Sequence, residues 1–345
     1  MKRKRSDLPI HAILLIIAAL TLLPFVLVLN NSIRTNSELY HTYFGVPQSL
    51  KQMSAFTWEK LSSDEDAFEI RVTNDLDTVA ANPDADAEAA DPDNAAAESS
   101  AAFRMKKTTY AGAMAHLWSQ LTRGFTHSWG TFRPYMINSL FVSIVSASGV
   151  IVIGSVSAYV FSRYRFPGHK LLFLAILSFM MIPGVLTLVP SFLWVKQLGM
   201  INSYSVMILP YITGGQIIAI FLFKGFFDGL PQELFESARL DGAGHFAQYW
   251  HIVLPLSKQI VSVVAVVNIL STWNNFLWPL ITNPDAKYAV VSTGLFLLNS
   301  TQTAGGGDRS VLFAAYILAS IPLLILFVYA TKPFMAGVTS GAFKA

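Results

Sequence analysis

Six long apolar runs, whose interiors lack charged side chains, alternate with polar segments along the chain. Each run is long enough for a helix to cross a hydrocarbon core of roughly 30 Å at about 1.5 Å per residue. None shows the charged face that a helix on the surface of a soluble protein presents at a period near 3.6. The pattern predicts an all-α membrane protein with six transmembrane helices, at residues 10–30, 137–161, 171–194, 204–224, 258–281 and 311–331.

Two further features of the pattern bear on the number of spans. The apolar run at 289–298 is too short to cross a bilayer, and we expect a surface or re-entrant segment there. The first run follows a basic stretch, Lys2 to Arg5, as it would in a cleaved signal peptide. Its apolar part exceeds the usual roughly 7–15 residues, and no small-residue cleavage site follows at Asn30–Ser32, which favours an uncleaved anchor.

Basic residues next to the spans predict which side of the membrane each connection faces, because lysine and arginine collect on the cytoplasmic side. The N-terminus 1–9, the loop 162–170, the long loop 229–257 and the tail 332–345 all carry such residues and are predicted to be cytoplasmic. Segments 31–136 and 282–310 are then extracellular. We therefore expect a multi-pass protein of the cell membrane with both termini in the cytoplasm.

Composition supports the membrane assignment and separates one segment from the rest. Of the 345 residues, 53% are hydrophobic and only 13% charged, against roughly 25% charged in a typical soluble domain. Between Asp64 and Glu98 lie twelve acidic residues and one basic residue, and the stretch 80–102 contains eleven alanines. Such a sequence buries too little apolar surface to fold by itself. We expect a partly disordered acidic insertion at about 60–105 within the extracellular segment.

Several classes of function lack the residues they need. The chain has no cysteine, no phosphate-binding glycine loop ending in Lys-Ser/Thr, no G-x-S-x-G turn and no pair of histidines spaced to hold a metal. No basic face interleaved with aromatic residues indicates nucleic-acid binding. We expect a non-catalytic chain that binds no cofactor and no metal, so the energy for any transport must come from an ion gradient or from another polypeptide.

The cytoplasmic loop 229–257 contains the most informative local pattern. Pro231 suits a first helical position, Glu233 and Glu236 favour a helix N-terminus, and Gly242 can end the helix, which gives about eleven residues or about 16 Å. Leu234, Phe235 and Ala238 form an apolar stripe. A second short helix is expected at about 245–253. From the residues alone, this pattern fits a docking helix and an interfacial helix without a partner equally well.

The same loop resembles a known family. Glu236, Ser237, Ala238, Gly242 and the later residues Ile252, Leu254 and Pro255 match the pattern E-[AS]-A-x-x-x-G-x₉-I-x-L-P, which is similar to the signature loop of bacterial ABC-importer permeases. The stretches YVFSRYRFPG (159–168), TWNNFLWPLI (272–281) and PFMAGVTSGAFKA (333–345) resemble the carbohydrate-uptake class of these permeases. Ser237 replaces the commoner alanine, and Ala345 replaces the usual final glycine.

The resemblance implies a type I ABC importer bundle of six transmembrane helices and a set of partners. These are a second permease subunit, an ATP-binding subunit dimer, an extracellular solute-binding protein, the lipid bilayer and a sugar substrate; ATP would be used by the partner subunit. The loop helix would dock into a cleft of the ATPase, with Glu236 paired to a basic group there. The implied ATPase-coupling residues are Glu233, Glu236, Ser237, Ala238, Arg239, Asp241 and Gly242.

Amides and indole rings in the fifth run suggest a sugar path, because sugars need hydrogen bonds and apolar faces. The alternative is helix–helix hydrogen bonding and anchoring at the membrane interface. An importer of a non-sugar polar solute also fits. An ion-coupled transporter would want intramembrane carboxylates or histidines, and a membrane-anchored receptor would not need the docking loop. The candidate path residues are Asn268, Trp273, Asn274, Asn275 and Trp278.

Overall fold

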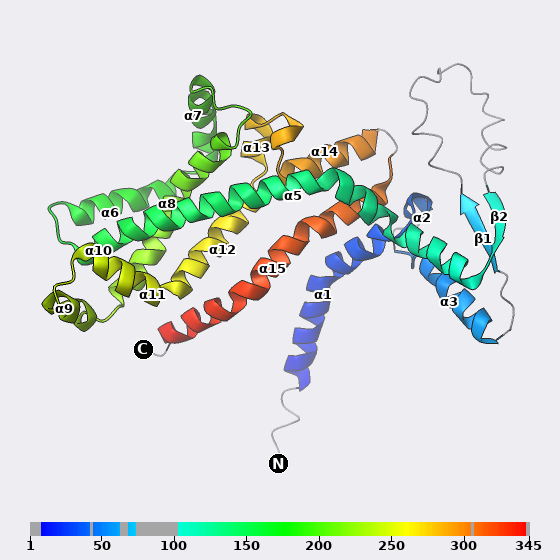
Figure 1. Cartoon of the computed structure of the whole chain (residues 1–345), viewed down its shortest axis with the longest axis horizontal. Helices are drawn as coiled ribbons and strands as arrows, with labels where there is room; N and C mark the ends of the chain where they lie inside the picture. Colours follow the sequence, from blue (N-terminus) through cyan, green and yellow to red (C-terminus); the bar gives the residue numbers. More distant parts are fainter. Residues whose placement is uncertain (1–7, 42–43, 63–67, 74–102, 305–306, 343–345) are drawn as a thin grey trace, which may run out of the picture. The chain divides into compact units, whose positions relative to one another are not determined.

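A computed structural model describes residues 8–41, 44–62, 68–73, 103–304 and 307–342, and helices make up most of it (Figure 1). The first elements are α1 (Leu8–Ser32), α2 (Asn36–His41), α3 (Gln48–Ser62), β1 (Phe68–Thr73), β2 (Phe103–Thr108) and α5 (Tyr110–Arg163). The middle elements are α6 (His169–Ser178), η1 (Phe179–Met181), α7 (Gly184–Gln197), α8 (Ser205–Asp228), α9 (Glu233–Leu240), α10 (His245–Gln248), η2 (Tyr249–Val253) and α11 (Leu254–Leu256). The last are α12 (Lys258–Asn274), α13 (Leu277–Thr282), η3 (Ala286–Tyr288), α14 (Val291–Ala304) and α15 (Arg309–Ala342).

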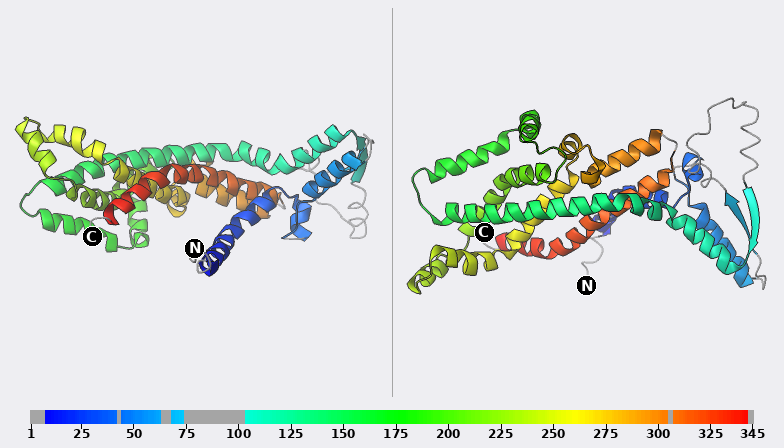
Figure 2. Two further views of the ribbon diagram at one scale, coloured as in Figure 1. Left: turned by 90° about the horizontal axis from the view of Figure 1, so that it is seen from below. Right: turned by 45° about the horizontal axis from the view of Figure 1, so that its top comes forward.

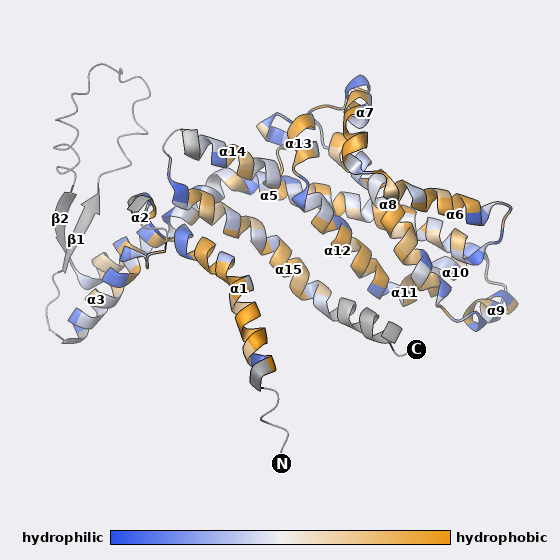
Figure 3. Ribbon diagram, turned by 180° about the vertical axis from the view of Figure 1, so that it is seen from behind, coloured by the Kyte–Doolittle hydropathy of each residue, from blue (hydrophilic) through white to orange (hydrophobic). Residues whose placement is uncertain are grey.

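The chain divides into two compact units. One comprises residues 1–127 and 308–314, and the other comprises 128–307 and 315–345. In the first unit, the most apolar window of α1 buries none of its residues inside the protein. Figure 3 shows this helix as almost continuously hydrophobic. Such a surface is stable in lipid and not in water, which agrees with the predicted first span.

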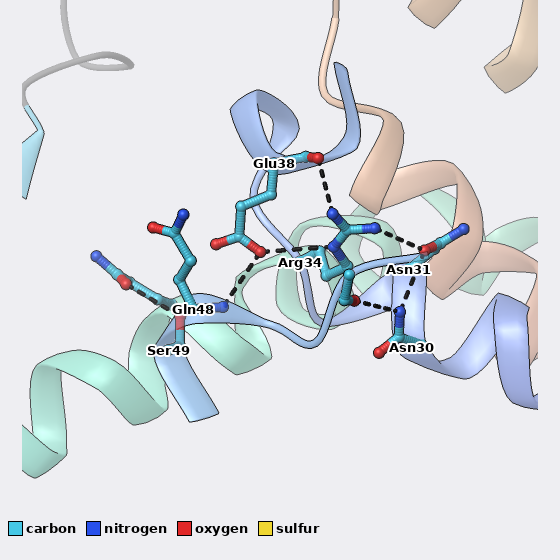
Figure 4. Close-up of polar contacts among 8 residues, drawn as sticks. Asn30, Asn31, Arg34, Glu38, Gln48 and Ser49 are labelled. Atoms are coloured by element: carbon cyan, nitrogen blue, oxygen red, sulfur yellow. Dashed lines mark hydrogen bonds and ion pairs between the residues drawn. The ribbon is translucent and has the colours of Figure 1, made fainter. Parts of the chain in front are cut away.

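A buried polar cluster follows the C-terminal end of α1 (Figure 4). The Arg34 guanidinium donates from Nη2 to the carbonyl oxygen of Glu38 at 2.8 Å, and its Nε lies 3.5 Å from a carboxylate oxygen of the same residue. That carboxylate also accepts the backbone N–H of Gln48, at the start of α3. Arg34 and Glu38 are buried, so the cluster holds the segment between α1 and α3 in a defined conformation.

The same unit contains the two strands, which depart from the expected all-α secondary structure. β1 pairs antiparallel with β2, with Phe68 opposite Thr108 and Thr73 opposite Phe103. The sequence of β1, FEIRVT, alternates apolar and polar residues and includes β-branched ones, which favours a strand. The strands and the end of α3 occupy the margins of the expected insertion at 60–105, while its centre at 74–102 lies outside the described residues.

In the second unit, α8 is the central helix and contacts α6, α12 and α13. Two apolar clusters of described residues lie in its core. The first joins α5, α8 and α12 to the connection between α8 and α12, and it includes Val150, Phe223, Phe227, Phe235 and Val264. The second joins α5, α7, α8 and α13 through Val142, Val195, Met207 and Trp278.

Among the described residues, four helices are long and apolar enough to cross a membrane: α1, α5, α8 and α15 up to Thr331. The number rises to six if each of two bent helix pairs counts as one span. The second expected span, at 137–161, is the later part of α5, which has 54 residues. The last expected span continues beyond residue 331, because α15 extends to Ala342.

The third expected span, 171–194, is not one straight helix. Its two halves, His169–Met181 and Gly184–Gln197, are bent by 97°. Pro183 is the cause, because the proline ring disfavours the helical conformation of the residue before it. Ile182 is accordingly extended, with ψ 117°, and Pro183 becomes the N-terminal cap of α7.

The fifth expected span, 258–281, is also interrupted. α12 ends at Asn274, Asn275 is extended with ψ 118°, and α13 begins at Leu277. Pro279 has no N–H to donate to the carbonyl of Asn275, which accepts the Ser292 hydroxyl instead at 2.7 Å. The short apolar run at 289–298 largely coincides with α14, a helix of 14 residues.

Candidate functional site

The loop between α8 and α12 lies at the end of its unit where α5 and α8 end (Figure 2). Its first helix, α9, has eight residues and is shorter than the expected eleven, because it begins at Glu233, two residues after Pro231, and ends at Leu240. The predicted stop at Gly242 is confirmed. Gly242 has φ 81°, and its backbone N–H donates to the carbonyl oxygen of Arg239. The backbone N–H of Ala243 donates to the carbonyl oxygen of Ala238. These two bonds form a Schellman motif, which satisfies the last carbonyls of the helix.

One face of α9 is exposed and carries most of the predicted coupling residues. Glu233, Glu236, Ser237 and Arg239 are exposed, and so is Asp241 directly after the helix. The Glu236 carboxylate accepts one hydrogen bond from the Gln232 side chain, at 2.8 Å. Leu240 is 90% exposed at the end of this face. The helix therefore offers two acidic groups, one basic group and an apolar tip to solvent.

The opposite face of α9 is anchored by a single aromatic side chain. Phe235 is 1% exposed and belongs to the cluster that joins α5, α8 and α12. The Arg163 guanidinium lies 3.8 Å above the centre of its ring. Burial lowers the pKa of Arg163, while the neighbouring Asp228 carboxylate acts in the opposite direction. The sequence pattern indicated an apolar stripe on α9 but missed this cation, which comes from a different span.

The second half of the loop contains a π-helical turn, η2, before the proline of α11. Tyr249 and Val253 of this turn are buried in the same apolar cluster as Phe235. The Ser257 hydroxyl donates to the carbonyl of Val253 at 2.5 Å. Extra residues in a helical turn and a following proline are common causes of sharp bends. Here the helices on either side of Ser257 are bent by 76°.

The structure separates the five candidate path residues. Asn268 is buried, and its side-chain oxygen has no hydrogen-bond partner in the described part of the chain. Asn274 is exposed and donates to the carbonyl of Leu270 in its own helix. The Asn275 side chain accepts the backbone N–H of Trp278, whose indole N–H donates to the carbonyl of Val206 at 2.8 Å. Trp273 is buried at the end of α12.

Of these five residues, only Asn268 lines the cavity of about 170 Å³ between α8 and α12. Two other buried polar atoms on α8 also have no partner within the residues that the structure describes, the Tyr211 hydroxyl and the Gln216 side-chain oxygen, and Tyr211 lines the same cavity. Sequence reasoning missed both, although each is a polar residue within an apolar run. The lining contains hydroxyl, amide and apolar groups and no charged residue: Val150, Pro210, Tyr211, Gly214, Gly215, Ile218, Ala219, Val264, Val267, Asn268, Ser271 and Thr272.

Comparison with known proteins identifies the family. Residues 150–334 match the family model described as the inner membrane component of binding-protein-dependent transport systems. This chain belongs to that family. The matched region contains the loop between α8 and α12 and the cavity.

The relatives are named as permeases for several different solutes. The chain is 33% identical to an arabinooligosaccharide transport permease of Halalkalibacterium halodurans, over 62% of this chain and 75% of that protein. It is 30% identical to a diacetylchitobiose uptake permease of Streptomyces coelicolor, over 64% and 73%. It is 31% identical to an sn-glycerol-3-phosphate transport permease of Yersinia pestis, over 70% and 86%.

A solved structure shares the fold. It is described as a bacterial ABC transporter involved in the import of the acidic polysaccharide alginate, and the similarity covers 97% of this chain and 99% of that one with a TM-score of 0.62. The sequence identity is 15%, so the likeness concerns the fold alone. The expectation of an ABC-importer permease is confirmed by the family match, and the fold agrees with it.

Proposed function

We propose that this chain is the membrane-spanning permease of an ATP-driven importer for a sugar or oligosaccharide. A separate dimer of ATP-binding subunits would dock on α9, an extracellular binding protein would deliver the cargo, and a second permease subunit would complete the path. Closure of the ATPase would displace α9 and drive the spans between outward-facing and inward-facing states. The observation that carries the proposal is α9 itself, an exposed acidic helix fixed to the bundle by the buried Phe235.

Docking is tested at Glu236, which we propose pairs with a cation of the ATP-binding subunit. Removing one partner of a partly desolvated pair costs about 2–5 kcal/mol, which corresponds to at least roughly 30-fold in a dissociation constant. Glu236→Lys should weaken binding of the purified ATP-binding subunit by at least this factor while the permease still inserts at normal abundance. Glu59→Lys, a charge reversal on α3, is the matched control. Equal affinity of both variants and the unmodified chain would refute docking through Glu236.

We propose that the chain crosses the membrane six times with both termini in the cytoplasm. The four long apolar helices, the bent pair α6–α7 and the positions of the basic residues support this topology. The absence of cysteine allows a direct test with single-cysteine variants and a membrane-impermeant maleimide. In intact spheroplasts, a cysteine at Lys51 of α3 should be labelled, whereas one at Ser237 of α9 should react only after lysis. Labelling of the Ser237 variant in intact spheroplasts would contradict the topology.

A neutral polyhydroxyl cargo is supported by the lining of the cavity between α8 and α12. Asn268, Tyr211, Ser271 and Thr272 can form hydrogen bonds, and no charged residue is present to hold a phosphate. A polyol phosphate is the alternative, because one relative is an sn-glycerol-3-phosphate permease. Calorimetry of the cognate binding protein with arabinan and chitin oligosaccharides and with glycerol 3-phosphate separates the two. Binding of glycerol 3-phosphate alone would exclude the sugar.

We further propose that Asn268 contacts the cargo as it passes. Its buried side-chain oxygen has no hydrogen-bond partner among the described residues, and Asn268 lines the cavity. Asn268→Leu should change the relative uptake rates of different oligosaccharides in proteoliposomes. Asn274→Leu is the control, because Asn274 is exposed and does not line the cavity. An unaltered selectivity profile for Asn268→Leu would remove this residue from the path.

A further inference from the structure

Three polar side chains follow one another at intervals of four residues along the last turns of α5. They are Ser155, Tyr159 and Arg163. Residues four apart lie on the same face of a helix, so the three side chains form one stripe. Each of them hydrogen-bonds to the connection between α8 and α12, although at least 67 positions separate the partners in the sequence.

Ser155 and Tyr159, the first two residues of the stripe, hold the second half of the loop between α8 and α12. The hydroxyl oxygens of Ser155 and Tyr249 lie 2.8 Å apart, and both residues are buried. The Tyr159 hydroxyl donates to the carbonyl oxygen of His245 at 3.3 Å. The Tyr159 and Tyr249 rings also pack with their centres 5.5 Å apart. These contacts fix α10 and η2 against α5.

Arg163 holds the first half of the loop. Its Nη2 donates to the carbonyl oxygens of Phe227 at 2.6 Å and of Leu230 at 3.2 Å, and the guanidinium covers the ring of Phe235. The two carbonyls lie at and just beyond the C-terminal end of α8, where a helix favours a positive charge. One planar guanidinium therefore joins the end of α8 to the buried face of α9.

We infer that Ser155, Tyr159 and Arg163 are positioning residues that clamp the loop between α8 and α12 to α5. The covalent chain connects this loop only to α8 and α12, and its side chains Phe235, Tyr249 and Val253 share an apolar cluster with α5. The three polar side chains add directional hydrogen bonds to this packing, so that a displacement of α9 is transmitted to α5 as well as to α8 and α12. This inference rests on the proposed function for its role in transport, although the clamp itself is a property of this chain alone.

The contribution of Arg163 to the clamp depends on the planar shape of the guanidinium. Its Nη2 binds two carbonyls while its plane covers the Phe235 ring, whereas the ammonium of lysine is a point charge on a flexible stem. Arg163→Lys therefore keeps the charge and loosens the attachment of α9 to α5. Arg165→Lys is the matched control, because Arg165 is exposed and hydrogen-bonds only to the neighbouring His169 in the described contacts.

Spin labels test the clamp without any partner protein. The cysteine-free chain allows labels at Arg165, two residues after the end of α5, and at Leu240, the exposed last residue of α9. Electron–electron distance measurement should give one narrow distribution, which Arg163→Lys or, more weakly, Tyr159→Phe broadens. For Arg163→Lys, the label pair at Val160 and Phe221, on α5 and α8, should keep its distance. An unchanged Arg165–Leu240 distribution in both variants would overturn the inference.

The role in coupling is measured separately as affinity for the ATP-binding subunit. Mutations along a coupling network change such affinities by roughly 2- to 30-fold, and Arg163→Lys should fall within this range. The control Arg165→Lys, measured without labels, should bind as the unmodified chain does. If Arg163→Lys also changes the Val160–Phe221 distance, that variant perturbs the helix bundle itself. Tyr159→Phe, which removes one hydroxyl only, is then the variant that tests the clamp. If neither the unmodified chain nor any variant binds the ATP-binding subunit, the proposed function fails. The label distances still show whether the clamp exists.

Discussion

Gly242 offers a clean test of how the end of α9 controls docking. Its φ of 81° lies in the left-handed region, and a Cβ at this position would meet nothing within 4 Å. The cost of Gly242→Ala is therefore conformational and not steric. A residue with a Cβ pays roughly 1–2 kcal/mol to adopt this region, which corresponds to a factor of about 5–30 in an equilibrium constant.

The expected consequence is a smaller population of the docking-competent loop. Without the Schellman motif, the last turn of α9 frays, and the orientation of Asp241 and Leu240 is no longer fixed. The apparent affinity for the ATP-binding subunit falls in proportion to the competent fraction, so the Kd should rise, with about 5- to 30-fold as the upper limit. Gly242→Asn should have a smaller effect, because asparagine tolerates the left-handed region better.

The chain supplies its own control two residues later. Gly244 also has open space where a Cβ would lie, but its φ of −67° and ψ of 167° are accessible to any residue. Gly244→Ala should therefore leave the Kd unchanged, as measured by biolayer interferometry on detergent-solubilised permease. Equal Kd values for Gly242→Ala and Gly244→Ala would refute the conformational argument, because both add the same methyl group.

Two further predictions concern the stability of the two units. Arg34→Met removes the guanidinium from the buried Glu38 carboxylate and should destabilise the protein by about 3–5 kcal/mol, measured as a lower Tm. The double variant Arg34→Met/Glu38→Gln should recover much of the lost stability. If Arg34→Met has the Tm of the unmodified protein, the pair has no structural role. Trp278→Phe keeps an aromatic ring but leaves the Val206 carbonyl without its donor, which should cost about 1–3 kcal/mol; an unchanged denaturation midpoint in SDS titration would show that the hydrogen bond contributes nothing.

The sequence by itself determined the positions of the long apolar helices and the end of the loop helix α9. Long apolar runs indicate helices directly, because a helix in lipid must satisfy its backbone internally and expose apolar side chains. Gly242 indicated the end of α9, because that conformation depends on the residue itself. The family resemblance rested on residues in this loop and agreed with the later match over residues 150–334.

The breaks in the third and fifth runs show where local reasoning stopped. Prolines within spans can be tolerated when neighbouring helices satisfy the freed carbonyls, so Pro183 and Pro279 did not by themselves predict a bend. In the structure, Ser292 satisfies the carbonyl of Asn275, and that contact depends on a helix 17 positions away. The strands β1 and β2 likewise depend on pairing between segments on either side of the insertion.

Only the tertiary structure decided which polar side chains face a cavity and which hold the fold together. An apolar run has no polar face, so its periodicity does not indicate which side turns inward. Asn268 and Asn274 therefore look equivalent in the sequence, whereas one lines a cavity and the other donates to its own helix. Arg163 reads as a charge at the end of a span. Its contact with Phe235 exists because folding brings together two segments far apart in the chain, which no local pattern records.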